Sequence, residues 1–298
     1  MLKIPNKQVV FAMSPLNPPV ACAKSGDTVQ FETLDCFGNQ IATESQLLCG
    51  INWDNINPAT GPLYIENAKP GDTLKVEILK IEIDKQAVMT NSPGHGVFGD
   101  KISDEKTKVL PIENGCARFN DKIALPICPM IGVIGTSPVS TAIETGSPGA
   151  HGGNMDCNQI IEGSTLYLPV NVDGALLAMG DLHAVMGDGE ISVCGAEIAG
   201  LVTVRISIIK NSKLPLPFLK SNGCAMALSS ADTLDNAAKA ATLAMQNLIC
   251  DTLPLDFHDA GMLLSLTGNL RICQVVDPLV TCRMELPLWI WEKYNTTI

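Results

Sequence analysis

Up to about residue 210, short runs of alternating apolar and polar residues lie between clusters of Gly, Pro, Asn and Asp. Leu74–Ile83, Leu166–Val172 and Ala199–Ile209 are three such runs. Alternation with a period of two is typical of strands with one buried face, and the intervening residues are typical of turns. The pattern predicts an antiparallel β-sandwich or barrel-like core over residues 1–210.

A ten-residue pattern occurs twice in this part of the chain. Ala23–Glu32 reads AKSGDTVQFE, and Ala68–Glu77 reads AKPGDTLKVE, displaced by 45 residues. Each copy places a Gly-Asp turn before a run with strand periodicity. Two copies are too few for a solenoid, so we interpret them as a turn-strand device used twice within one β-rich unit.

The periodicity changes after Pro217, where apolar residues begin to recur in steps of four and three. This spacing predicts a helix within Ser230–Cys250, capped by Ser229 or Ser230. Its apolar positions are Leu234, Ala238, Ala241, Met245 and Leu248.

A second helix is expected over Asp256–Thr267, ended by a left-handed C-cap at Gly268-Asn269. The last predicted strand is Val280–Leu286. Because no linker separates the two parts, we predict one integrated α+β unit over residues 1–298, β-rich to residue 210 and α/β over residues 211–298.

The negative net charge of the chain argues against some classes of binding partner. The 298 residues include 20 Lys+Arg against 31 Asp+Glu, a formal net charge of −11, and the few clustered lysines are interleaved with acidic residues. Nucleic acids and anionic membranes require a basic face, so neither is an expected partner. Apolar residues make up 46% of the chain and aromatic residues only 4%, which predicts a globular protein that does not bind bases or glycans by stacking.

Eleven cysteines are scattered singly along the chain, with no C-x-x-C pair. This favours reduced, mostly buried thiols in a cytoplasmic protein over a disulfide scaffold or a zinc ribbon. The apolar cluster near the N-terminus is interrupted by prolines and is too short for a signal peptide, and no run is long enough for a transmembrane helix.

Candidate chemistry is concentrated in three Gly-rich segments that each contain a histidine. In the third, Gly180–Glu190, a strand would place Asp181 and His183 on one face, and Asp188 and Glu190 follow two residues apart. Imidazole with carboxylates is the ligand set of an open zinc site or a similar divalent site. The alternative is that Gly-Asp-Gly is only a hairpin turn and that Asp181 is a cap.

The other two segments are more ambiguous. His151-Gly152-Gly153-Asn154-Met155-Asp156 offers an imidazole, a carboxylate and an amide that could donate to an oxyanion, but Asn154 could equally form a structural turn. The Gly-His-Gly loop around His95 is either part of a site or a surface loop.

Asp54 beside Trp53 suits a metal ligand at a strand end, although spacing alone favours a turn residue. Cys157 near His151 invites a thiol mechanism, whereas the common fate of a lone cysteine is burial. The G-x-S-x-G, H-E-x-x-H and phosphate-loop patterns are all absent, which leaves a metal-activated water as the economical nucleophile.

Several segments together resemble the acetamidase/formamidase family of amide hydrolases in its shorter form. The most specific are the strings HGGNMD at 151–156 and GDLHAVMGDGE at 180–190. Further similarity lies in segments 61–64, 70–78, 129–135, 166–170 and 270–278.

The resemblance implies hydrolysis of a short aliphatic amide to a carboxylate and ammonia, a homo-oligomer, and a divalent metal that is zinc, calcium or another divalent ion. The expected metal ligands are Asp54, His95, Asp181, His183 and Asp188. Glu190 is expected to accept the proton of the water, with Asn154 and His151 as further catalytic groups. Asp156, Gly152 and Gly153 are expected to face the substrate. The competing hypothesis is a non-catalytic β-rich protein that binds a metal or a small ligand.

Overall fold

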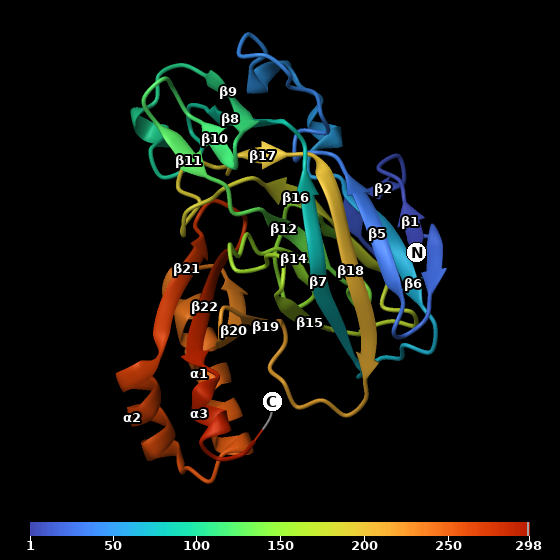
Figure 1. The fold of residues 1–298 in the computed structure, drawn as a ribbon, viewed down its shortest axis with the longest axis vertical. Helices are drawn as coiled ribbons and strands as arrows, with labels where there is room; N and C mark the ends of the chain where they lie inside the picture. The colour runs from blue at the N-terminus through green and yellow to red at the C-terminus, as the bar shows by residue number, and fades with distance from the viewer. Residues whose placement is uncertain (297) are drawn as a thin grey trace.

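The computed structural model describes residues 1–296 and 298, and it has two large sheets and a helical layer (Figure 1). The first sheet has nine strands and is antiparallel except at its β1–β5 edge. Its order is β1 (Leu2–Ile4), β5 (Thr28–Thr33), β18 (Gly200–Ile209), β7 (Thr73–Ile83), β15 (Thr165–Pro169), β19 (Phe218–Ser221), β20 (Cys224–Ala231), β22 (Val280–Pro287) and β21 (Asn269–Gln274).

The second sheet has eleven strands and carries most of the chemistry discussed below. Its main path is β11 (Ala124–Pro126), β10 (Cys116–Arg118), β9 (Lys106–Glu113), β8 (Gln86–Asn91), β17 (Glu197–Ile198), β16 (Leu177–His183), β12 (Met130–Gly135) and β14 (Gly152–Asn154). Strand β6 (Ala59–Ile65) joins it at β16 and also pairs with β2 (Val9–Val10) and β4 (Ala21–Ala23). A separate pair joins β3 (Ala12–Met13) and β13 (Ile143–Glu144).

The core lies between the two sheets and confirms the predicted β-rich α+β class. Phe31 on β5 and Val76 on β7 are in one buried cluster with Ile131 on β12 and Met179 on β16. The cluster consists mainly of aliphatic side chains and alanine, as the low aromatic content requires. Burying aliphatic surface on the inner faces of two sheets is the main stabilising contribution in such a sandwich.

The two copies of the sequence repeat become β5 and β7, which lie on either side of β18. In each copy the Gly-Asp turn has the same hydrogen bond. Asp27 Oδ2 accepts from the backbone N of Lys24 at 2.8 Å, and Asp72 Oδ2 accepts from that of Lys69 at 2.8 Å. The repeat is therefore one local device that starts two strands of the same sheet.

Helices α1 (Leu234–Thr252), α2 (Phe257–Thr267) and α3 (Trp289–Glu292) lie at the β20–β22 end of the first sheet (Figure 1). Three short 3-10 helices occur elsewhere: η1 (Leu48–Gly50), η2 (Trp53–Asn55) and η3 (Gly99–Lys101). Within the described residues, no helix is both long and apolar enough to cross a membrane.

Three predicted details of the helices are wrong. Ser229 and Ser230 are in β20, where they pair with Cys282 and Thr281, so α1 begins later and is capped by Thr233. Its buried face includes Ala237 rather than Leu234 and Ala238. Helix α2 has the expected N-cap at Asp256, but Gly268 has φ −79° and ψ 152°, so the chain leaves the helix directly into β21 without a left-handed cap.

Candidate active site

A cluster of acidic side chains surrounds one imidazole at the carboxyl end of β16. His183 ends this strand, Asp181 lies two residues before it, and Glu197 on β17 pairs directly opposite His183. Asp156 follows β14, and Glu190 lies in the loop that leaves β16. Four segments of the second sheet and its loops therefore supply one site.

The imidazole of His183 is within 4.0 Å of four carboxylates. Its Nε2 is 3.0 Å from Glu197 Oε1, 3.4 Å from Asp181 Oδ1, 3.7 Å from Asp156 Oδ1 and 4.0 Å from Glu190 Oε1. The other ring nitrogen, Nδ1, lies 3.2 Å from the Met186 sulfur. This arrangement turns Nε2 toward the carboxylates.

Many polar atoms of the cluster have no hydrogen-bond partner within the described part of the chain, although all are buried. They are both carboxylate oxygens of Asp156, Asp181 Oδ1, His183 Nε2, Glu190 Oε2, Glu197 Oε2, Asp277 Oδ2 and Asn154 Oδ1. Buried polar atoms normally have partners, because leaving one unpaired costs about 1–3 kcal/mol. So many free ligand atoms in one place could hold a cation.

The backbone at the site is also unusual. Asp156, Asp181 and Glu190 all adopt left-handed conformations, with φ of 43°, 56° and 44°. Such conformations are uncommon for residues other than glycine, although asparagine and aspartate adopt them more often than most, and they persist where the surrounding structure enforces them. A Cβ on Gly132 would lie 2.4 Å from Asp156 Oδ1 and 2.7 Å from Asp181 Oδ2, so this glycine makes room for both carboxylates.

The electrostatics of the cluster couple the proton affinities of its members. Burial lowers the pKa of His183, but the Glu197 and Asp181 carboxylates outweigh this effect and hold it well above its ordinary value. Burial raises the pKa of Glu197 to about 8. Burial and the charge of Asp181 together raise the pKa of Asp156 to about 7. Burial and the Asp156 charge also hold the pKa of Glu190 well above its ordinary value. Each buried carboxylate is therefore stabilised by a nearby proton or cation, because its own negative charge is unfavourable beside the other carboxylates.

A cavity of about 140 Å³ opens onto this cluster. Asp181, Glu190 and Glu197 form its acidic wall. The other lining residues are Cys36, Phe37, Leu48, Trp53, Ile56, Asn57, Thr90, His95, Asn154, Val193, Cys194 and Asp277. This volume is well below the roughly 300–1,000 Å³ of sites for drug-sized ligands, so the cavity suits a compound of a few heavy atoms.

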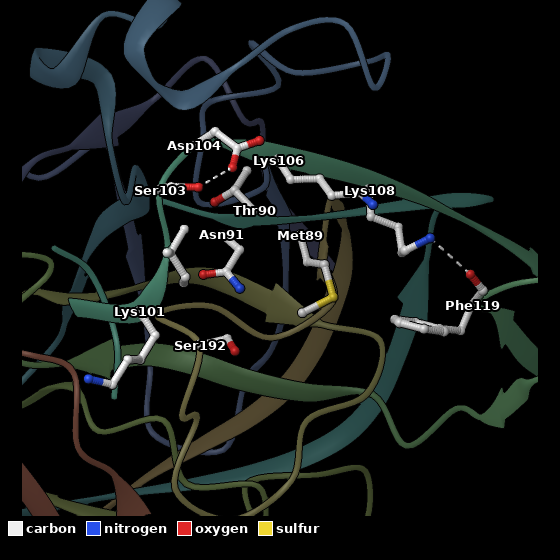
Figure 2. A pocket seen from close by; sticks show the side chains of 11 residues that line it. Met89, Thr90, Asn91, Lys101, Ser103, Asp104, Lys106, Lys108, Phe119 and Ser192 are labelled. Carbon is white, nitrogen blue, oxygen red and sulfur yellow. Dashed lines mark hydrogen bonds between the residues drawn. The ribbon is translucent and has the colours of Figure 1, made fainter. Parts of the chain in front are cut away.

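A second cavity, of about 540 Å³, is lined by residues of β8, β9 and the loop between them, and it shares Thr90 with the first (Figure 2). Lys101, Lys106 and Lys108 surround it, and Lys108 donates to the carbonyl of Phe119 at 3.2 Å. None of the buried carboxylates lines this cavity. A third cavity, of about 360 Å³, is lined mainly by apolar residues and also reaches Glu190.

The structure brings several of the sequence-predicted residues together at the site. Asp181, His183 and Glu190 are in the cluster, and Asp156 lies close enough to His183 and Glu190 to share a ligand with them. Asn154 faces the small cavity. His95 lines it as well and stacks on Trp53 with ring centroids 6.2 Å apart, but both are exposed, so His95 lies at the outer end, away from the carboxylates.

Asp188 and Asp54 lie outside the cluster, so the structure gives no support for them as ligands of a metal held there. The turn that contains Asp188 runs alongside β21, and both carboxylate oxygens accept from Arg283, at 2.7 Å from Nη1 and 2.9 Å from Nη2. Asp54 is exposed on η2, where its backbone N–H is bound by the side chain of the cap residue Asn52.

His151, Gly152 and Gly153 do not line the cavity, so the structure gives no support for a direct role. The His151 ring is buried in its own turn, close to Gly149 and Gly153. Gly152 and Gly153 have φ of 94° and 80°. A Cβ on Gly152 would lie 2.4 Å from the Ile134 carbonyl oxygen, so the glycines serve the close approach of β14 to β12.

Sequence reasoning missed Glu197, Asp277 and Cys36. Glu197 had a detectable signal, since it is a lone carboxylate within the apolar run Ala196–Ala199. Asp277 and Cys36 lie in polar turns far from the three histidine segments. Only the fold brings them to the cavity, because they follow β21 and β5 respectively.

Fold and site together define a β-rich protein with a small, buried carboxylate–imidazole centre. The sequence matches the profile of the acetamidase/formamidase family over residues 12–147 and 139–293. The chain belongs to this family.

The comparisons include two solved structures with the same fold over nearly the whole chain. One is an acetamidase from Bacillus halodurans, with 49% identity, TM-score 0.97, and 98% of this chain and 99% of that chain covered. The other is a protein from Thermoanaerobacter tengcongensis described as a predicted acetamidase/formamidase, with 44% identity, TM-score 0.97, and 100% of this chain and 99% of that chain covered. A formamidase from Methylophilus methylotrophus is 28% identical over 65% of this chain and 62% of its own length. The chain spans less than two thirds of the curated relatives it matches.

Proposed function

We propose that this protein is a metal-dependent amidase that hydrolyses short aliphatic amides, such as formamide or acetamide, to a carboxylate and ammonia. The family and the names of its relatives support the reaction class. The observation that carries the proposal is the group of buried carboxylate and imidazole atoms that have no hydrogen-bond partner among the described residues, beside a cavity with room for a very small substrate.

The residues present fit a divalent cation. One ligand atom each from Asp156, His183 and Glu190 lie within 4.8 Å of one another. Carboxylate oxygens with an imidazole nitrogen suit zinc or a similar divalent ion. When bound, such an ion polarises the amide carbonyl and lowers the pKa of a water molecule toward neutrality.

The chain's own groups would manage the protons and the position of the substrate. Glu190 would accept a proton from the attacking water and return it to the departing nitrogen, because an amine leaves readily only when protonated. Asn154 has a free Oδ1 that could accept from the N–H group of the substrate amide and so fix its orientation. The third cavity, which reaches Glu190, offers a route for a small product.

The test is ammonia release from formamide and acetamide, measured on the protein as isolated, after dialysis against a chelator, and after Zn²⁺ is restored. Activity should be lost with the metal and return with it. His183→Ala should lose metal and activity together while keeping the circular dichroism spectrum. The exposed His258 on α2 provides the matched control, and His258→Ala should change neither property.

The outcomes separate the parts of the proposal. Activity that survives complete removal of metal would contradict metal dependence. A protein that is fully loaded with metal and hydrolyses none of the short amides would contradict the substrate class and favour a non-catalytic metal- or ligand-binding protein.

The proposal includes a homo-oligomer in the cytoplasm. Exposed apolar side chains on α2 and β21, among them Phe257, Met262, Leu266 and Leu270, support self-association, because such groups are often covered in an assembly. All eleven cysteines are free, which supports a reducing compartment. Light scattering coupled to gel filtration would give the mass, and a monomer would contradict the first point.

A further inference from the structure

A second set of metal-type ligands adjoins the first. Cys36, Asp181 and Glu197 each offer one ligand atom, and these atoms lie within 4.8 Å of one another. The three residues come from the loop after β5, from β16 and from β17. All three are buried, and all three line the 140 Å³ cavity.

The carboxylates of this set have free oxygens that face the cavity. Asp181 is 3% exposed and Glu197 is 1% exposed, yet Asp181 Oδ1 and Glu197 Oε2 have no hydrogen-bond partner within residues 1–296 and 298. The other oxygen of Glu197 is already held, since Oε1 accepts from the backbone N of Gly195 at 2.8 Å. That bond fixes the carboxylate and leaves Oε2 for an external ligand.

Charge balance also favours a ligand here. The carboxylates of Asp156, Asp181, Glu190 and Glu197 lie within 4.0 Å of a single imidazole, and when all four are ionised one divalent cation would neutralise only two of them. Uncompensated buried charge is strongly unfavourable, so a second cation would stabilise the cluster.

We propose that Cys36, Asp181 and Glu197 hold a second divalent cation beside the one assigned to Asp156, His183 and Glu190. Binding would displace the thiol proton of Cys36 to solvent, which leaves a thiolate as the ligand. Thiolate ligands select zinc and similar ions over magnesium and calcium. Two adjacent cations are a recurrent arrangement in hydrolases. The inference rests on the proposed function, since it presumes that the first position is a metal site.

The experiment measures metal stoichiometry and the identity of a ligand, independently of activity. The metal-free full-length protein is titrated with Co²⁺, and bound metal is counted by mass spectrometry. Two equivalents should bind, and one of them should produce the near-ultraviolet charge-transfer band of a Co²⁺–thiolate bond. Cys36→Ser should lose that band and one equivalent while it keeps the other.

Cys194 provides the matched control, because it lines the same cavity and is equally buried. Its sulfur accepts from the Thr90 backbone N at 3.2 Å and contacts the Thr90 carbonyl at 3.4 Å. Cys194→Ser should therefore retain two equivalents and the charge-transfer band. If Cys36→Ser does not fold, as judged by circular dichroism, Cys36→Ala takes its place.

Saturation of the wild type at one equivalent with no thiolate band would overturn this inference and leave the proposed amidase intact. Persistence of the band in the Cys36 variant would overturn the ligand assignment. Conversely, two equivalents with the band in a protein that releases no ammonia from amides would support the second site and contradict the proposed function.

Discussion

His151 makes the stability of this protein depend on pH in a way that one substitution can isolate. Its ring is buried, neither nitrogen has a hydrogen-bond partner within the described residues, and burial lowers its pKa from 6.5 to about 4. Between these two values the unfolded chain binds a proton at this position and the folded chain does not. The free energy of unfolding therefore falls as the pH is lowered from 6.5 toward 4.

The size of the effect follows from the two pKa values. The full difference corresponds to about 3.4 kcal/mol, at about 1.36 kcal/mol per pKa unit. Lowering the pH from 7.5 to 5 should reduce the free energy of unfolding by about 2 kcal/mol. The rest of the difference would appear only below pH 5, as the pH approaches the pKa of His151 in the folded state. For a chain of this length that loss lowers Tm by about 4 °C.

Differential scanning calorimetry at pH 7.5 and pH 5 on wild type and His151→Gln provides the assay. The neutral glutamine removes the titration, so the decrease in Tm between the two pH values should be smaller in the variant by about 4 °C. The comparison uses the difference between pH values, so a general loss of stability in the variant does not affect it. Replacing the exposed His258 by glutamine should leave the wild-type difference unchanged. Equal decreases in wild type and His151→Gln would refute the reasoning.

Four further outcomes are expected. Glu190→Gln should reduce the amount of bound metal and lose roughly 10²–10⁴-fold or more in kcat for ammonia release, because Glu190 is assigned both as a ligand and as the proton acceptor, and near wild-type turnover with normal metal content would contradict both roles. Arg283→Met should reduce the free energy of unfolding in urea by about 2–3 kcal/mol, because it leaves the mostly buried Glu285 and the partly exposed Asp188 unpaired, and an unchanged midpoint would contradict this. Thr233→Ala should cost about 1 kcal/mol by removing the cap of α1, with activity unaffected. Cys157→Ser should keep most of the activity, and a loss of several orders of magnitude would revive a thiol nucleophile.

The fold class could be predicted because strand periodicity and turn residues are local properties. The runs at Leu74–Ile83 and Ala199–Ile209 became β7 and β18 to within one residue. The start of α1 could not be predicted in the same way. Ser229 and Ser230 are good caps, but pairing with β22 extends β20 through them, and this tertiary pairing overrides the local preference.

The site was predictable where its residues share one strand or one loop. Asp181 and His183 were placed on one face by their spacing along a strand, and Glu190 was singled out in the turn that follows. Asp188 has the same spacing, yet its carboxylate binds Arg283 from β22, which no local pattern could indicate. Cys36 and Asp277 reach the cavity from distant parts of the chain, so only the topology of the two sheets could reveal them.

The ion pair between Asp188 and Arg283 connects the Glu190 loop to the C-terminal portion of the chain, which limits how that portion can be exchanged with a relative. The loop with Glu190 is joined to the C-terminal portion at several points: Gly189 N donates to the Cys273 carbonyl at 3.0 Å, and Val275 N donates to that of Gly189 at 3.1 Å. Asp277 from the same portion lines the cavity. In a chimaera that joins residues 1–210 of this chain to the C-terminal portion of a relative, the residues that contact the Glu190 loop would come from the relative. Exchange of the C-terminal portion at this boundary should alter catalysis, even though all of the Gly180–Glu190 segment stays on the side that is kept.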